Sequence, residues 1–188
     1  MSETLRAIAS SSAKLGVLAL AAALAVSGVD SLTRPRIATE RANAAAVVLA
    51  AELDIARLAH GSIAEPRGAA IDVCADGIAL RVLHGRADGY GGPIDVDVAV
   101  DGQMRVVGAG VAHHRETRPL ADPVVEPGSA FLRAFIGRDG RVPGRFALAR
   151  DGGDVDAVTG ATLTSRAVLA GIATALSAAP PTPIECSR

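Results

Sequence analysis

The chain has 188 residues, of which 49% are hydrophobic and 2% aromatic, and its formal net charge is −1. This length suits about one domain, with room for an added anchor, and it is enough to bury a core. The near-neutral charge gives a nucleic-acid role no electrostatic support, so we expect no nucleic-acid partner. Because tryptophan is missing and tyrosine occurs once, the core must be built mainly from Val, Leu, Ile and Ala.

An uncharged apolar run, LGVLALAAALAVSGV, follows Lys14 and ends before Asp30. Extended to residue 33, it approaches the roughly 20 apolar residues that a membrane-spanning helix needs. We therefore predict a transmembrane anchor over 15–33, behind a short cytoplasmic N-terminus over 1–14. A signal peptide cleaved after Ala25 and a buried soluble helix remain alternatives. The basic residues on the two sides of the run do not settle its orientation.

Residues 37–60 are rich in Ala and Leu and contain neither Gly nor Pro. This composition favours a helix, and Pro35 and Gly61 mark its ends. We predict a membrane-proximal helix within 34–62.

Four short strands are predicted next, over 69–75, 78–83, 94–100 and 104–113. In the third, apolar residues alternate with Asp95, Asp97 and Ala99, which is the period of a half-buried strand. An Asp-Gly pair at 101–102 is a strong signal for the hairpin turn between the last two strands.

The last third of the chain predicts a short helix over 128–137 with Ser129 as its N-cap, and a strand over 146–149. A longer apolar helix begins near Ser165, and prolines end it. The elements together indicate an α+β fold with antiparallel strands and flanking helices.

Two cysteines, Cys74 and Cys186, lie far apart and can pair only if the C-terminal tail folds back. We expect a buried thiol and a loose tail thiol instead, since no disulfide framework or CxxC spacing is present. We also expect no metal site, because the adjacent His113 and His114 point to opposite faces of a strand.

The segment 154–166 has the sequence DVDAVTGATLTSR and allows two interpretations. In the first, Thr162 or Thr164 caps a helix, and the glycine serves a turn. In the second, free N–H groups at the helix start attract a phosphate, Gly160 allows close approach, and a threonine hydroxyl becomes esterified by that phosphate. Residue chemistry alone leaves both open.

The TGAT sequence at 159–162, with Asp156 ahead of it and Thr164 behind, closely resembles the flavinylation motif of the FMN-binding domain family. The stretches GYGGPIDVDVAVDGQMRVVG, HRET and FLRAFIG resemble further segments of that family in the same order. In this family a separate flavin transferase attaches FMN through its phosphate to the last threonine of the motif, which is Thr162 here. The resemblance thus implies an FMN-binding domain over 63–178 and a tail over 179–188.

The resemblance implies covalent FMN and a set of cofactor-binding residues: Glu116, Thr117, Leu120, Asp156, Thr159, Gly160, Ala161, Thr162, Leu163 and Thr164. The chain departs from the family's usual sequence in one segment. The family usually continues Glu-Thr into a Gly-Leu-Gly turn, whereas this chain has RPLAD at 118–122. A different loop shape beside the cofactor is therefore expected.

Domains of this family occur in the G subunit of the Rnf electron-transport complex and in the C subunit of the sodium-pumping NADH:quinone oxidoreductase; this short chain resembles the former more. The resemblance implies a single-pass protein of the bacterial inner membrane with its flavin domain on the periplasmic side. The protein would relay electrons in a complex that couples ferredoxin/NAD electron transfer to ion translocation. Its partners would be the other membrane and iron–sulfur subunits of that complex, and it would not catalyse a reaction alone. Four alternatives remain: a C subunit of the sodium-pumping oxidoreductase, another respiratory flavinylated carrier, a structural subunit without flavin and a periplasmic binding module.

Overall fold

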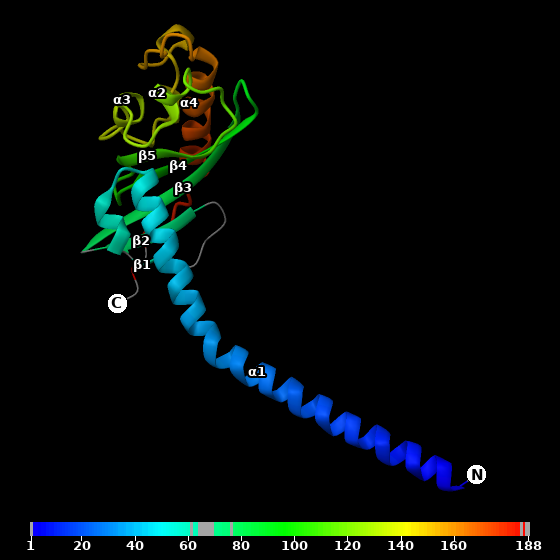
Figure 1. Cartoon of the computed structure of the whole chain (residues 1–188). Coiled ribbons are helices and arrows are strands. Elements are labelled where there is room, and N and C mark those ends of the chain that lie inside the picture. Colours follow the sequence, from blue (N-terminus) through cyan, green and yellow to red (C-terminus); the bar gives the residue numbers. More distant parts are fainter. Residues whose placement is uncertain (1, 61, 64–69, 76, 185, 187–188) are drawn as a thin grey trace. The chain divides into compact units, whose positions relative to one another are not determined.

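The computed structural model describes residues 2–60, 62–63, 70–75, 77–184 and 186. It divides into two units, Met1–Arg41 and Ala42–Arg188 (Figure 1). Helix α1, Ser2–Glu52, contributes to both units.

Within the first unit, Gly16–Ile37 forms 22 residues of helix with a mean hydropathy of 1.7, long and apolar enough to cross a membrane. Near the end of this run, Arg34 pairs with Asp30 at 2.6 Å. The sequence predicted that a separate helix begins after Pro35, but α1 continues through this proline. A proline removes one backbone hydrogen bond, a loss that a helix of 51 residues tolerates.

The second unit is built on a five-stranded antiparallel sheet whose strands follow one another in chain order. The strands are β1 Ser62–Ile63, β2 Ala70–Ala75, β3 Ile78–Asp88, β4 Pro93–Val100 and β5 Val106–His113. The predicted hairpin is confirmed as β4 and β5, closed by Asp101, whose N–H donates to the Arg105 carbonyl at 3.0 Å. Strand β3 extends beyond the predicted Leu83, because residues up to Asp88 pair with β4.

One face of this sheet packs against α4, Thr162–Ser177. Gly85 of β3 makes the close approach possible, since a Cβ there would lie 2.1 Å from the Gly171 carbonyl oxygen of α4. The core between them is aliphatic with three phenylalanines; its members include Leu83, Ile94, Val96, Val98, Phe131, Phe135, Phe146, Leu169 and Ile172.

The opposite face is covered by the last turns of α1 and the 3-10 helix η1, Ala56–His60. The helix that was predicted to reach His60 ends at Glu52 instead. Two residues later, Asp54 adopts a left-handed φ of 54°, which interrupts the helix before η1. Apolar side chains fill this second core, among them Leu49, Leu53, Leu58, Val73, Leu80, Val82 and Ala99.

The connection from β5 to α4 carries two short helices, α2 Asp122–Val125 and α3 Ala130–Arg133, and two 3-10 turns, η2 Pro143–Arg145 and η3 Ala149–Asp151. Ser129 caps α3 as predicted, accepting from Leu132 N at 3.2 Å. The predicted strand over 146–149 is wrong. There the chain turns back on itself, so that Leu148 forms only an isolated bridge with Val155.

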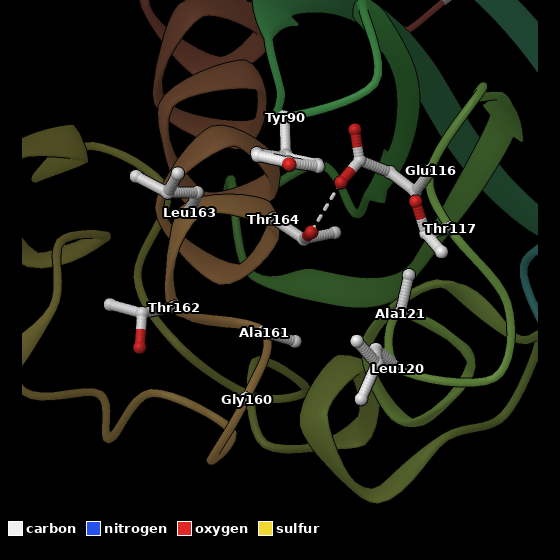
Figure 2. A pocket seen from close by; sticks show the side chains of 10 residues that line it. All are labelled: Tyr90, Glu116, Thr117, Leu120, Ala121, Gly160, Ala161, Thr162, Leu163 and Thr164. Carbon is white, nitrogen blue, oxygen red and sulfur yellow. Dashed lines mark hydrogen bonds between the residues drawn. The ribbon is translucent and has the colours of Figure 1, made fainter.

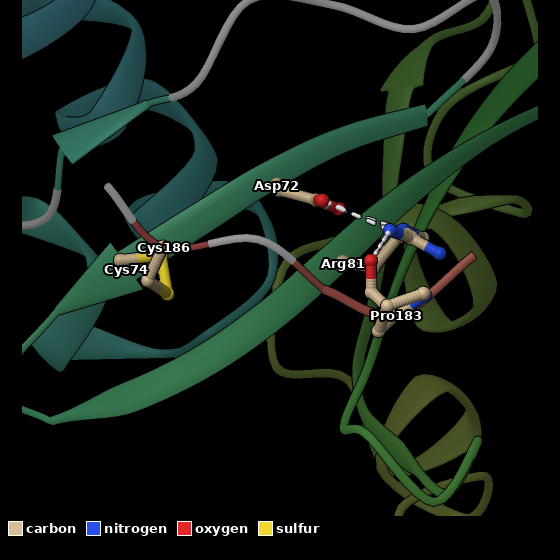
Figure 3. The surroundings of a disulfide bond; sticks show 5 residues. All are labelled: Asp72, Cys74, Arg81, Pro183 and Cys186. Carbon is tan, nitrogen blue, oxygen red and sulfur yellow. Dashed lines mark hydrogen bonds and ion pairs between the residues drawn. A yellow bond between two sulfur atoms is a disulfide. The ribbon is translucent and has the colours of Figure 1, made fainter.

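The C-terminal tail folds back over the sheet, and Cys186 forms a disulfide with Cys74 of β2, with a Cα–Cα distance of 5.8 Å (Figure 3). Our expectation of two free thiols is therefore wrong. The physical reason is Arg81, a buried β3 side chain that donates hydrogen bonds to the carbonyls of Pro180, Thr182 and Pro183. Sequence spacing does not reveal such long-range anchoring of a tail.

Candidate functional site

A cavity of about 440 Å³ lies where three segments of the second unit meet. The segments are the β3–β4 loop, the connection after β5 and the start of α4. Its lining combines apolar and hydroxyl side chains with one carboxylate: Tyr90, Glu116, Thr117, Leu120, Ala121, Gly160, Ala161, Thr162, Leu163 and Thr164 (Figure 2). This volume lies in the range of small-molecule and cofactor sites.

The first turn of α4 opens onto this cavity with unused donors. Ser165 N is the first to bond back along the helix, to the Ala161 carbonyl at 2.8 Å. In the described part of the chain, the N–H groups of Thr162, Leu163 and Thr164 have no acceptor, and neither has the Thr162 hydroxyl. Three free amides and the positive end of a helix dipole form a favourable environment for an anion such as phosphate.

The turn that precedes α4 is held by Ser165, not by either predicted threonine. Ser165 is fully buried, and its hydroxyl accepts from Val158 N at 3.2 Å. Ala161 is the N-cap and makes no side-chain capping bond, which corrects the expectation that Thr162 or Thr164 caps the helix. Gly160 has a φ of 83°, a left-handed conformation that favours glycine.

Glu116 is the charged residue of the cavity, and it is 7% exposed. Its Oε1 accepts from Gly91 N at 2.7 Å, and its Oε2 accepts from the Thr164 hydroxyl. Figure 2 shows Thr164 turned toward Glu116, whereas Thr162 projects away from that pair. The two threonines of the motif's second half therefore have different environments: one is bonded and buried, the other is free.

Most predicted site residues meet at this cavity, while Asp156 and Thr159 do not line it. Both are exposed and lie in the segment ahead of Gly160. The prediction missed Tyr90 and Ala121. A signal for Tyr90 was present, because an aromatic residue flanked by glycines in GYGG is poorly suited to a packed core.

The RPLAD segment contributes directly to the cavity wall through Leu120 and Ala121. Tyr90, Leu120 and Leu163 are 72%, 58% and 53% exposed, so large apolar side chains lie at the cavity's mouth. Such exposed apolar groups around a concave site are typical of ligand or partner binding.

Comparisons with known proteins match the part of the chain that builds this cavity. Residues 89–177 match the model of the FMN-binding domain family. The chain is similar to the G subunit of the ion-translocating oxidoreductase complex of Stutzerimonas stutzeri, at 40% identity over 90 residues, which are 47% of this chain and 40% of that protein.

The corresponding protein of Shewanella loihica is 34% identical over 97 residues, 50% of this chain and 46% of the relative. That of Escherichia coli is 39% identical over 84 residues, 44% and 41% of the two chains. These matches span less than half the length of the relatives. The segment that matches the FMN-binding domain family, residues 89–177, supplies every residue lining the cavity.

Proposed function

We propose that this chain is a membrane-anchored carrier of FMN, joined through its phosphate to Thr162, that relays electrons within an Rnf-type ion-translocating complex. The observation that carries the proposal is the start of α4. There the TGAT sequence places a free Thr162 hydroxyl beside three free backbone N–H groups at the edge of a cavity. We infer the type of complex from the names of the similar proteins, each of which is a G subunit of an ion-translocating oxidoreductase complex.

The residues present suit a flavin mononucleotide. The N–H groups of the first turn of α4 would hold the phosphate, and Gly160 supplies the left-handed turn that exposes them. Tyr90, Leu120 and Leu163 offer apolar surface for the ring. When bound, FMN supplies one- and two-electron chemistry, while the protein supplies binding, orientation and electrostatics. Asp156 and Thr159 lie outside the cavity, where a modifying enzyme has access to them.

The attachment needs a flavin transferase and a flavin nucleotide whose phosphate is activated as an anhydride. The Thr162 Oγ–phosphorus bond forms while the anhydride bond breaks. The leaving phosphate takes the bonding electron pair, and the hydroxyl proton passes to a base of the transferase. An unbonded hydroxyl such as that of Thr162 is better suited to this attack than the engaged hydroxyl of Thr164.

The proposed topology is a cytoplasmic N-terminus over 1–14, an anchor over 15–33 and a flavin domain on the periplasmic side of the inner membrane. The disulfide between Cys74 and Cys186 supports that side, because disulfides persist in oxidising compartments and are rare in the cytosol. The partners would be the other membrane and iron–sulfur subunits of the complex. A mature protein whose N-terminus lies near Val26 would instead indicate a cleaved signal peptide.

The test is covalent flavin on the full chain. The chain is produced with an active flavin transferase, denatured and separated on a gel, and the protein band is examined for flavin fluorescence. We expect fluorescence in the wild type and in Thr159→Ala, and none in Thr162→Ala. Fluorescence that persists in Thr162→Ala and disappears in Thr159→Ala would move the attachment to the other threonine.

A transferase shown to be active on another flavinylated protein is the control for a negative result. If it leaves every version of this chain without flavin, the carrier proposal is wrong, and a structural subunit without flavin becomes the better interpretation.

A further inference from the structure

Glu116 connects two segments that are far apart in the chain. It follows β5, and its two carboxylate oxygens accept from Gly91 of the β3–β4 loop and from Thr164 of the first turn of α4. From the connection after β5, the Glu116 side chain therefore bridges the β3–β4 loop and the start of α4, which form two walls of the cavity (Figure 2).

A carboxylate suits this bridge, because a backbone N–H donates to one of its oxygens and a hydroxyl donates to the other. No ion pair to Glu116 occurs within the described residues. Burial of a charge without a cation is costly, so the two charge-assisted hydrogen bonds are what hold this group in place.

The β3–β4 loop is packed tightly against the same region. A Cβ on Gly91 would lie 2.1 Å from the Arg115 carbonyl oxygen, and one on Gly89 would lie 2.5 Å from Glu116 Oε1. Gly89 N also donates to the Gly92 carbonyl at 2.8 Å, which closes the loop. Tyr90, at the tip of this loop, is 72% exposed. Its own packing therefore contributes little to its position, which depends on the backbone on either side.

We propose that Glu116 is a positioning residue: its carboxylate ties the Gly89–Gly92 loop to the start of α4 and so holds Tyr90 as an aromatic wall of the cavity. The value of that wall for a flavin ring rests on the proposed function. The bridge itself does not, because it exists between groups of this chain alone. The residue acts through Gly91 and Thr164 and needs no contact with a cofactor.

The sequence provides a selective probe, because Tyr90 is the single tyrosine and the chain has no tryptophan. Tyrosine fluorescence of the full chain in detergent therefore reports this loop. We would measure its anisotropy without flavin, together with hydrogen exchange of the peptide containing Gly91. Glu116→Ala removes both acceptors, and Thr164→Val removes one donor with little change of shape. We expect lower anisotropy and at least about tenfold faster Gly91 exchange in both variants.

Glu126→Ala is the matched control, because it makes the same change at an exposed carboxylate outside the cavity, and it should leave both signals unchanged. Unchanged anisotropy and exchange in a folded Glu116→Ala protein would overturn the proposal. If Glu116→Ala does not fold, Thr164→Val decides: altered signals support the bridge and unaltered signals overturn it.

A second arm uses chain that carries flavin. There, quenching of Tyr90 emission by the flavin should be strong in the wild type and weaker in both variants. Equal quenching in the wild type and both variants would overturn the assignment of Tyr90 as a wall positioned by Glu116. If no version takes up flavin, the proposed function fails, while the flavin-free arm still decides whether Glu116 positions the loop.

Discussion

Asp72 on β2 and Arg81 on β3 form a buried, bidentate ion pair: Arg81 Nε lies 2.6 Å from Asp72 Oδ1, and Arg81 Nη2 lies 2.9 Å from Asp72 Oδ2. The remaining donors of the same guanidinium bind tail carbonyls, that of Thr182 at 2.7 Å and that of Pro183 at 3.0 Å (Figure 3). Arg81 is thus the point at which the sheet, a buried carboxylate and the C-terminal tail meet.

Replacing Arg81 by Ala should destabilise the protein strongly. It removes the cation that faces a buried carboxylate, a change that costs about 3–5 kcal/mol in comparable cases, and it frees the tail carbonyls. Arg86→Ala is the matched control on the same strand, since Arg86 is exposed and pairs with Asp95 at 2.8 Å. We expect it to cost less than about 1 kcal/mol. Urea unfolding of the full chain in mild detergent measures both, and equal losses would contradict the special role of Arg81.

The disulfide should add stability separately. It links residues 112 positions apart, and closure of a loop of that length contributes about 2–5 kcal/mol. Cys186→Ser should lower the free energy of unfolding by this amount under oxidising conditions. In the presence of a reductant, wild type and variant should unfold alike, which provides an internal control. A variant as stable as the oxidised wild type would show that the tail is held by its carbonyl contacts alone.

The parts of the fold that could be predicted from the sequence are those with local periodicity. Apolar residues alternate with Asp95 and Asp97 because only one face of that strand enters the main core, and the Asp-Gly pair specifies the following turn. The tail could not be predicted, because its position depends on Arg81, about a hundred residues away in the chain. The strand expected over 146–149 failed for a related reason: burial of Phe146 and Leu148 in the core explains their apolar character without a strand.

The residues of the site likewise include some that could be predicted from the sequence and some that could not. The motif around Thr162 could be located because its residues are contiguous, and Glu116 was found through a second motif. Tyr90 was missed although its flanking glycines in GYGG make a packed core position unsuitable for it. The role of Ser165 was missed because three neighbouring hydroxyls are equivalent candidates for a cap until the helix start is known.

Ser165→Ala tests the local order ahead of the helix. The change leaves Val158 N, which donates to the Ser165 hydroxyl at 3.2 Å, without its acceptor. A fully buried unsatisfied donor costs about 1–3 kcal/mol, and Val158 N is half-buried, which places the expected loss at the lower end of this range. We expect a loss of stability in this range and reduced covalent flavin attachment at Thr162. Ser177→Ala, an exposed hydroxyl near the end of the same helix, should change neither quantity. A drop in stability with normal flavin attachment would mean that the turn does not position Thr162.

Glu52, the last residue of α1, should make the stability of the protein depend on pH. Burial, the nearby charge of Asp97 and a hydrogen bond to it raise the pKa of Glu52 to about 8, from an ordinary value of 4.5. Asp97 in turn contacts His84 Nδ1 at 2.9 Å. Since the pKa is higher in the folded state, folding retains a proton that the unfolded chain releases. This stabilisation is complete below pH 4.5 and is lost as the pH rises to about 8.

The free energy of unfolding should therefore fall by up to about 1.4 kcal/mol per pH unit between these two pKa values. Glu52→Gln should flatten that part of the profile, because a glutamine amide also donates to Asp97 but does not ionise. Glu126→Gln, an exposed carboxylate, should retain the slope of the wild type. Urea unfolding at several pH values between 5 and 9 gives the three profiles. If wild type and Glu52→Gln show the same slope, another group titrates in this range, and the shared proton between Glu52 and Asp97 does not link the end of α1 to the sheet.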